Sequence, residues 1–512
     1  MSQLKKGAVL NYTTIFLINV GGLLLTPFIL SRLGQEEYGI YITIGALVGT
    51  ISLFDFGLNN TVVRFVAKYR AEKDGEGEEN FLAVVMWLYL IIAGLVIISG
   101  LIFYQFIDSY FTKMEPDELH IAKMMFIILV LNLAVSLPGN AFTGICYGYE
   151  EFVFPKGLNI IKYITRSLSV VGLLLFGGKA VALVILDTVF NFGVIAITVY
   201  FVFKKLKVRI KLHNFSKKFV KEIFSYSTWI FVFAIVGIFQ WKAGHWVLGR
   251  MSEPGVLAIY GIGITLGTYY GAFSTAISSV FLPRATQMAV DKASGEELTD
   301  MMIKIGRISF IVLMYVLGAF LFYGEQFVFL WVGGELGVEG SYQAWLIAMM
   351  IMLAYTLPLV QGFGNSILEA KNKLRFKAIL YLSFMIAGTA LGAFLAYDFG
   401  AVGMITGSVC GWIIVQNVMN IYYHRVITIN IFRFFKELLK KTALAIGIAF
   451  GMAYLINFIP GSGWLNFVLK ASVYSVIFLP ISYYVGMIQF EKNLILDSLA
   501  PLSKFIKSRK NA

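Results

Sequence analysis

The sequence predicts an all-α polytopic membrane protein with about fourteen transmembrane helices, organised as two six-helix lobes and a C-terminal helix pair. Three observations lead to this fold class: a composition poor in charge, a series of long apolar runs, and an internal repeat. Of the 512 residues, 58% are hydrophobic and 14% are Asp, Glu, Lys or Arg, whereas charged residues make up roughly 25% of an ordinary soluble protein. Because so few charged side chains cannot cover several water-facing domains, the composition excludes a soluble enzyme, a disordered scaffold and a secreted disulfide framework.

The apolar runs supply the spans one after another. A helix needs about 20 apolar residues to cross the hydrocarbon layer, and we count fourteen such runs, with twelve as the alternative count. Tight hairpins are predicted around residues 177–178 and 398–400. The predicted spans are Ala8–Leu30, Tyr38–Val63, Phe81–Phe106, Ile121–Tyr147, Gly157–Gly177, Ala180–Phe203, Phe224–Gly249, Val256–Pro283, Ile308–Val332, Tyr342–Leu368, Phe376–Tyr397, Ala401–Tyr423, Thr442–Ile459 and Leu465–Gln489.

Lysine and arginine are distributed unevenly between the two sets of loops. The loops on the side of the N-terminus carry 33 of the 42 lysines and arginines, and those on the opposite side carry five. Since positive loops stay in the cytoplasm, we expect a multi-pass protein of the cytoplasmic (inner) membrane with both termini cytoplasmic. The net charge of +13 is then a determinant of topology and a contact for lipid headgroups, not a sign of nucleic-acid binding.

The first six spans recur in the next six at an offset of 218 to 221 residues. Residues 30–41 correspond to 248–260, Arg64 to Arg284, and Pro138 to Pro358. Six is an even number, so both copies enter the membrane in the same direction, which predicts two lobes around a pseudo-twofold axis with a central site, as in alternating-access transporters. The predicted divisions are an N-terminal lobe at 1–210, a C-terminal lobe at 211–430, and the last two spans with a cytoplasmic tail at 431–512.

The first hairpin carries the run RLGQEEYGIY at 32–41, followed by FDFGL at 54–58 and RFVAKY at 64–69. This hairpin strongly resembles the polysaccharide-transporter (oligosaccharide flippase) family of the multidrug/oligosaccharidyl-lipid/polysaccharide exporter superfamily. The resemblance implies two six-helix lobes plus a C-terminal pair, and translocation of undecaprenyl-pyrophosphate-linked sugars to the outer leaflet. The related lipid II flippases carry arginines in span 1, where this chain has no charge before Arg32, so their anion site is not carried over.

The resemblance leads us to expect a flippase for a polyprenyl-(pyro)phosphate-linked oligosaccharide that works by alternating access in surface polysaccharide biosynthesis. The expected partners are the lipid-linked oligosaccharide, membrane lipids and a monovalent cation or proton, with no nucleic acid and no cofactor, and the protein is expected to be a monomer. The alternative is a cation-coupled drug or small-solute antiporter of the same superfamily. A polymerase or ligase is disfavoured because the external segments are short. No phosphate-cradling loop for ATP is present.

Ionisable residues inside spans are the candidate functional residues, because each costs roughly 2.5–3.5 kcal/mol on insertion scales. Lys162 and Arg166 are four residues apart and share a helix face, and Asp187 of the next span lies at a similar predicted depth. Two interpretations stay open for Arg166: an ion pair with Asp187 inside the lobe, or a site for cargo phosphate or a proton, with Lys162 beside it and Asp187 in ion coupling.

Lys242 in span 7 is the leading candidate for contact with a pyrophosphate or acidic sugar, because span 7 should line the cavity. Its alternative role is to extend towards the external interface. Asp55 in span 2 either carries a coupling cation, neutralises Lys242 or Arg64, or caps a neighbouring helix.

The remaining candidates are related by the repeat or suited to sugars. Arg64 and Arg284 could form an entry gate for a diphosphate headgroup, or simply anchor their spans at the cytoplasmic face. Tyr269 and Tyr270 suit stacking on sugar rings, with helix packing as the alternative. Pro138 and Pro358 occupy matching places in spans 4 and 10, and we expect them to act as bending points during lobe movement.

Overall fold

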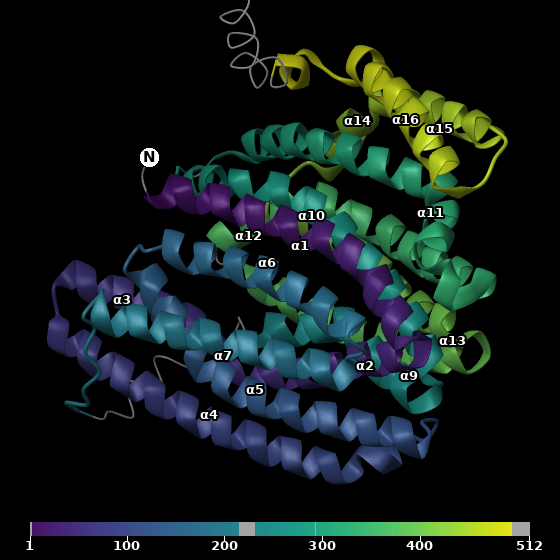
Figure 1. Cartoon of the computed structure of the whole chain (residues 1–512). Coiled ribbons are helices and arrows are strands. Elements are labelled where there is room, and N and C mark those ends of the chain that lie inside the picture. Colours follow the sequence, from purple (N-terminus) through teal and green to yellow (C-terminus); the bar gives the residue numbers. More distant parts are fainter. Residues whose placement is uncertain (1–2, 215–230, 292, 372, 494–512) are drawn as a thin grey trace, which may run out of the picture. The chain divides into compact units, whose positions relative to one another are not determined.

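The computed structural model of the chain is built from helices (Figure 1). The structure describes residues 3–214, 231–291, 293–371 and 373–493, and these contain no β-strand. The helices are α1 (Gln3–Leu33), α2 (Gln35–Ile51), the 3-10 helix η1 (Ser52–Asp55), α3 (Leu58–Glu72), α4 (Gly75–Tyr110), α5 (Pro116–Gly148), α6 (Val153–Leu175), α7 (Ala180–Lys204), α9 (Ala243–Met251), α10 (Pro254–Val290), α11 (Gly295–Val360), α12 (Gly362–Ala370), α13 (Leu374–Val426), α14 (Ile431–Leu439), α15 (Thr442–Asn457), α16 (Gly463–Ile481) and the π-helix η2 (Ser482–Gly486).

The helices that could cross a membrane confirm the predicted fold class. Within the described part of the chain, ten helices are long and apolar enough to span, or up to twelve if each of two bent helix pairs counts as one span. The helices α11 and α13 each contain a glycine in the left-handed region, Gly337 and Gly400, at which two helices join. The predicted hairpins at 177–178 and 398–400 are both present. The number fourteen stays a prediction, as does the repeat.

Contacts divide the chain into two compact units. The first unit comprises Met1–Ile262 and Ala378–Ser408, and the second comprises Gly263–Lys377 and Val409–Ala512. These units do not follow the boundaries expected at residues 210 and 430, because α10 and α13 each contribute to both units. The division into two lobes and a C-terminal pair therefore stays a prediction.

Local sequence signals explain where several helices begin. The Asp74 side chain accepts a hydrogen bond from the Gly77 N–H at 2.8 Å and so caps α4. A capping box begins α5 at Glu115, with Pro116 in the first turn, and a second one begins α11 at Ser294. These caps satisfy N–H groups that a helix leaves without partners in its first turn.

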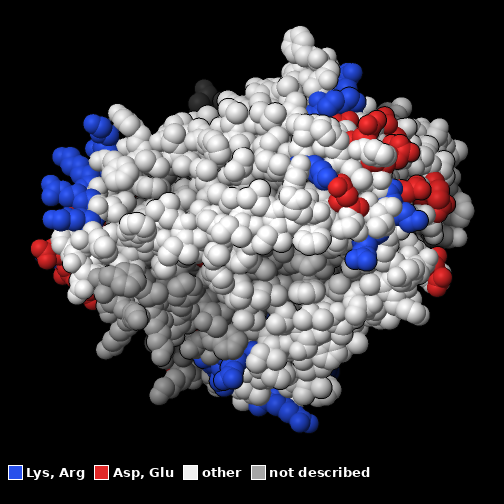
Figure 2. Space-filling view, turned by 90° about the horizontal axis from the view of Figure 1, so that it is seen from below, with Lys and Arg blue, Asp and Glu red and all other residues white. Residues whose placement is uncertain are grey.

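Each unit has an apolar core, and much of the protein surface is uncharged. In the first unit, α5 packs against α4, α7 and α3. In the second, Tyr315, Tyr323, Tyr474 and Phe478 join α11 to α16 in a cluster of aromatic rings. Figure 2 shows one face of the molecule, in which wide areas carry neither Lys and Arg nor Asp and Glu. Such uncharged surface is what contact with lipid requires.

Candidate functional site

An arginine–aspartate pair joins α6 to α7 within the first unit. Arg166 donates from Nε and from Nη2 to the two carboxylate oxygens of Asp187, the second bond being 2.9 Å. The hydroxyl of Tyr41, on α2, donates to the same carboxylate at 3.4 Å. The Arg166 and Asp187 side chains are 22% and 26% exposed. Because the contact is bidentate, each charge is neutralised in place.

One turn along the same two helices, Lys162 continues this polar cluster. Its Nζ donates to Asn191 Oδ1 at 3.2 Å, and the Asn191 amide donates to Asn132 Oδ1 at 2.8 Å and to the Ser136 hydroxyl. Asn132 and Ser136 lie on α5, so the cluster links three helices. Lys162 donates to a neutral amide, so this end of the cluster has an excess positive charge. We call the set Tyr41, Asn132, Ser136, Lys162, Arg166, Asp187 and Asn191 the charged network.

The charged members of this network are predicted from the sequence, but the neutral ones are not. Asn132 and Ser136 are four residues apart, and so are Asp187 and Asn191. This is the same spacing as Lys162 and Arg166, and it places each pair on one helix face. A search for polar residues with matched spacing on neighbouring spans would have found them.

Asp55 lies where span 2 is broken. The chain leaves α2 through η1 and passes through Phe56 and Gly57, whose φ angles are 50° and 72°, before α3 begins. The Asp55 carboxylate accepts a hydrogen bond from Tyr89 at 3.1 Å and interacts with the backbone N–H groups of Gly57 and Asn59. This arrangement favours the capping role for Asp55. No salt bridge of Asp55 occurs among the described residues.

Lys242 lies at a 42° bend between the helix Phe231–Trp241 and α9. Its Nζ donates to the backbone carbonyl of Gly49, near the end of α2, at 2.8 Å. A Cβ atom at Gly49 would lie 2.4 Å from that nitrogen. The absence of a side chain at Gly49 therefore leaves room for the ammonium group beside the carbonyl. The side chain is directed into the first unit in this structure, rather than extending along its own helix.

The other candidates are not members of the charged network. Arg64 is exposed on α3, and Arg284 belongs to α10, but its side chain lies outside the described residues. Tyr269 is half-buried on α10. The Tyr270 ring is 1% exposed, and its hydroxyl bonds to Thr356 at 2.6 Å, which favours packing over sugar stacking in this conformation.

The two prolines have different surroundings. The helix α5 continues through Pro138 to Gly148. By contrast, α11 ends two residues after Pro358, and Gln361 separates it from α12. Gln361 is fully buried and bonds to Asn420 at 2.8 Å and to Gln416. The structure thus has a break next to Pro358 but none at Pro138, and the role of both as bending points stays a prediction.

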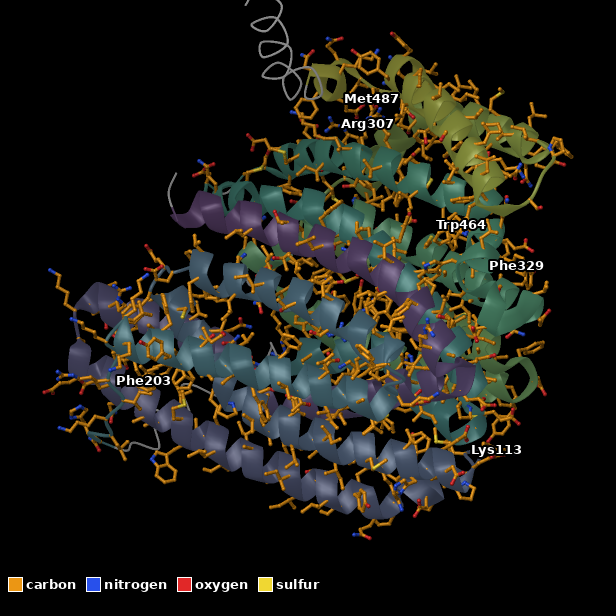
Figure 3. The ribbon with its side chains drawn as sticks, viewed as in Figure 1. Lys113, Phe203, Arg307, Phe329, Trp464 and Met487 are labelled. Carbon is orange, nitrogen blue, oxygen red and sulfur yellow. The ribbon has the colours of Figure 1, made fainter. Side chains whose placement is uncertain are left out.

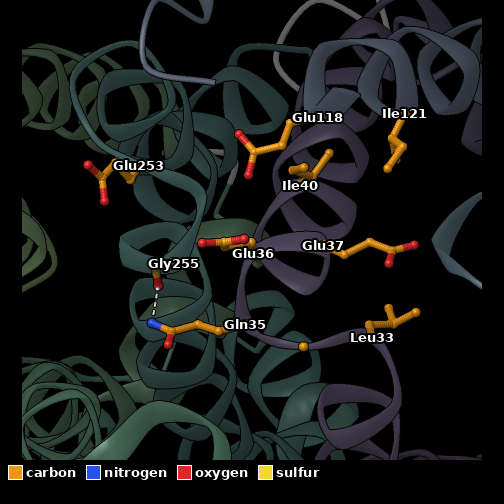
Figure 4. Close-up of a pocket in the computed structure, with 10 residues that line it drawn as sticks. Leu33, Gln35, Glu36, Glu37, Ile40, Glu118, Ile121, Glu253 and Gly255 are labelled. Carbon is orange, nitrogen blue, oxygen red and sulfur yellow. Dashed lines mark hydrogen bonds between the residues drawn. The ribbon is translucent and has the colours of Figure 1, made fainter. Parts of the chain in front are cut away.

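The hairpin motif at 32–41 builds a small acidic cavity that the sequence analysis did not anticipate. The cavity has a volume of about 460 Å³, and Figure 4 shows Glu36, Glu37, Glu118 and Glu253 around it. Gln35 donates across it to the Gly255 carbonyl at 3.0 Å. Glu37 accepts from the Ala180 N–H at 2.7 Å and so caps α7. The polar side chains of this motif therefore have a structural role, because they form hydrogen bonds with neighbouring helices.

A second missed residue is Arg307, which appears in the sequence as an ordinary cytoplasmic positive charge. Its side chain is 2% exposed and forms an ion pair with Glu491, which is also 2% exposed. It also donates to the carbonyls of Glu437, Lys440 and Gly486 at 2.6 to 2.8 Å. Figure 3 labels Arg307 close to Met487, at the start of the C-terminal segment. Arg307 thus joins α11 to the ends of α14 and η2.

The described residues contain no group of three or more His, Cys, Asp or Glu that could hold a metal ion. What the fold does provide is a set of long apolar helices with ionisable side chains inside them. Such intramembrane charges are typical of transport pathways. The fold and these residues together define the class as a multi-pass helical membrane protein with ionisable side chains inside its spans.

Comparison with known proteins gives the family. Residues 4–289 match the polysaccharide biosynthesis protein family, and the chain belongs to this family. A protein named "Putative O-antigen transporter" from Shigella flexneri is 20% identical over 385 residues, which cover 73% of this chain and 87% of that protein.

Solved structures support the same fold. A lipid II flippase MurJ structure in an inward closed conformation has a TM-score of 0.71 at 16% identity, covering 96% of this chain and 99% of that one. An inward-facing multidrug resistance MATE family transporter has a TM-score of 0.64 at 15% identity, covering 82% and 98%. At these identities the likeness is one of fold. The family and the all-helical membrane fold class are thereby confirmed.

Proposed function

We propose that this protein is a flippase that carries a polyprenyl-(pyro)phosphate-linked oligosaccharide from the cytoplasmic to the outer leaflet by alternating access. The observation that carries the proposal is the excess of positive charge inside the first unit. Lys162 and Lys242 each donate to neutral oxygens, while Arg166 is the charge already paired with a carboxylate. Cationic side chains of this kind suit a diphosphate headgroup, whose oxygens form charge-assisted hydrogen bonds.

In the proposed mechanism the headgroup enters from the cytoplasm while the polyprenyl tail stays in lipid. Arg64 and Arg284 attract the diphosphate at the entrance, and Lys242, Lys162 and Arg166 neutralise it further in, with Tyr269 beside the sugars. Asp187 and Asp55 are the carboxylates through which a proton or monovalent cation couples to the cycle. Pro138 and Pro358 allow their helices to bend.

Location and topology are part of the proposal. We place the protein as a monomer in the cytoplasmic membrane with both termini in the cytoplasm. Reporter fusions after residues 178 and 400 should report the outside, and fusions at either end should report the cytoplasm. A reversed pattern would refute the assigned orientation.

The experiment that tests the function is deletion of the gene followed by analysis of surface glycan and of lipid-linked intermediates. A flippase predicts loss of one surface polysaccharide and accumulation of its lipid-linked unit inside the cell, both restored by the wild-type gene. Normal surface glycan in the deletion strain would refute the proposal.

A second candidate, a cation-coupled drug or small-solute antiporter, is favoured by one observation. The cavity lined by Glu36, Glu118 and Glu253 is acidic and suits a cationic solute. Efflux of a cationic dye from cells that express the protein separates the two functions. Dye efflux with normal glycan would favour the antiporter, and absent dye efflux with lost glycan would favour the flippase.

A further inference from the structure

Span 2 is interrupted at the point where α2 ends. After Ile51 the chain tightens into η1, and Phe56 and Gly57 are left-handed. The last turn of an α-helix has carbonyls without intrahelical partners, and this end carries the negative end of the helix dipole. Inside a membrane protein these carbonyls require donors from elsewhere.

Two side chains supply such donors to one carbonyl, that of Gly49. Ser52 Oγ, in the same turn, donates to it at 2.6 Å. Lys242 Nζ, from a residue 193 positions away, donates to it at 2.8 Å. A positive charge at the C-terminal end of a helix is stabilising because it opposes the helix dipole. Lys242 is therefore a capping cation for α2.

Lys242 lies at an interruption as well. It separates the helix Phe231–Trp241 from α9, and the two are bent by 42°. The hydrogen bond thus joins the break in span 2 to the break in span 7. The same two segments also pack through α2 and α9.

The ammonium group keeps the capacity to bind something else. An ammonium has three donors, and within the described part of the chain Lys242 has no salt-bridge partner. Asp55, which could have neutralised it, is bonded to Tyr89 instead. A neutral carbonyl is a weaker acceptor for an ammonium than a phosphate oxygen, because the phosphate oxygen adds the attraction between two opposite charges.

We propose that Lys242 is a positioning residue that exchanges partners: it caps α2 in the empty protein and moves to a diphosphate oxygen of the cargo, which releases span 2 from span 7. This inference rests on the proposed function, since that function supplies the diphosphate. Gly49 is the second residue that this exchange of partners requires, because only a residue without a side chain leaves room for the ammonium group at its carbonyl.

The test uses the purified full chain in lipid nanodiscs with undecaprenyl diphosphate as the probe. Two quantities are measured: the affinity for the probe, and the hydrogen–deuterium exchange of peptides covering residues 46–57. In the wild type, the probe should speed exchange at the end of α2 roughly tenfold, because it removes the cap.

Three variants and a control separate the roles. Lys242→Met should bind the probe about tenfold more weakly, and its α2 end should exchange fast with or without the probe. Lys242→Arg should keep most of the affinity. Gly49→Ala should exchange fast without the probe and bind it several-fold more tightly, since no competing carbonyl holds the ammonium. Gly45→Ala, one turn earlier on α2 with no neighbour within 4 Å, should behave as the wild type.

Each contrary outcome is informative. If Lys242→Met changes exchange but not affinity, Lys242 is a structural cap and the exchange of partners is wrong, while the flippase function stands. If it changes affinity but not exchange, Lys242 binds cargo without holding α2, and the proposal is again overturned. If the wild type does not bind the probe, the diphosphate cargo and the exchange fail together, and only the capping contact remains.

Discussion

Two arginine–carboxylate pairs of the described residues, one in each unit, have different surroundings. Arg307 and Glu491 in the second unit are each 2% exposed, and the arginine also bonds to backbone carbonyls at the ends of α14 and η2. Arg166 and Asp187 in the first unit are 22% and 26% exposed, and their neighbours are the side chains of the charged network.

The comparison separates a structural ion pair from a functional candidate. Arg307 donates to acceptors in several directions, all of them in the C-terminal segment. Its charge therefore stabilises the packing of that segment. The first unit places a second cation, Lys162, one turn from its pair, with a neutral amide as the partner. A partly exposed cation without a carboxylate partner inside a membrane protein lowers the stability of the fold. Such charges are typical of sites that bind ligands.

The largest expected effect comes from Arg307→Met. The substitution leaves Glu491 buried and unpaired, and it removes donors from four carbonyls, so the free energy of unfolding should fall by about 3–5 kcal/mol. Thermal unfolding of the detergent-solubilised protein, with proteolysis of the C-terminal segment, measures the loss. Lys304→Met, at an exposed lysine three residues earlier on α11, is the matched control. Equal melting of the two variants would remove Arg307 from its structural role.

Arg166→Leu should destabilise less, by about 2–3 kcal/mol, because water reaches part of the Asp187 carboxylate. The double variant Arg166→Leu with Asp187→Leu should recover part of that stability, since no unpaired charge remains. Neither variant should export glycan. Export at the wild-type level by the double variant would show that this pair, like Arg307–Glu491, is structural only.

The neutral cluster of the second unit offers the next test. Gln361→Leu removes the hydrogen bonds of Gln361 to Asn420 and Gln416, and we expect a loss of about 1–2 kcal/mol with glycan export largely retained. Thermal unfolding and surface-glycan staining measure the two effects. Loss of export at unchanged stability would mean that the second unit, too, contains a functional polar cluster.

Lys162→Met should have the smallest effect on stability, about 0.5–1 kcal/mol, because it removes one hydrogen bond to a neutral amide. Export should nevertheless fall at least about tenfold if the ammonium contacts cargo phosphate. Lys156→Met, nearer the start of α6, controls for loss of one positive charge. Equal export by both variants would remove Lys162 from the pathway.

The sequence predicted the fold class well because apolar runs and loop charges report directly on the membrane. It also predicted the shared face of Lys162 and Arg166 and, as one of two interpretations, the pair with Asp187. It did not indicate that Arg307 is buried, since a loop arginine and a buried one look alike without the distant Glu491. Nor could it place Lys242 on Gly49, because that contact depends on two helix breaks far apart in the chain.

The central claim is that this chain moves an anionic lipid-linked oligosaccharide across the bilayer through its positively charged interior. Purified protein in proteoliposomes, given a fluorescent polyprenyl-diphosphate oligosaccharide and an impermeant quencher, tests it most directly. We expect saturable translocation well above that of protein-free vesicles, and its loss in Lys242→Met and in the Arg166–Asp187 double variant. Translocation no faster than in empty vesicles, under an imposed proton or cation gradient of either sign, would contradict it.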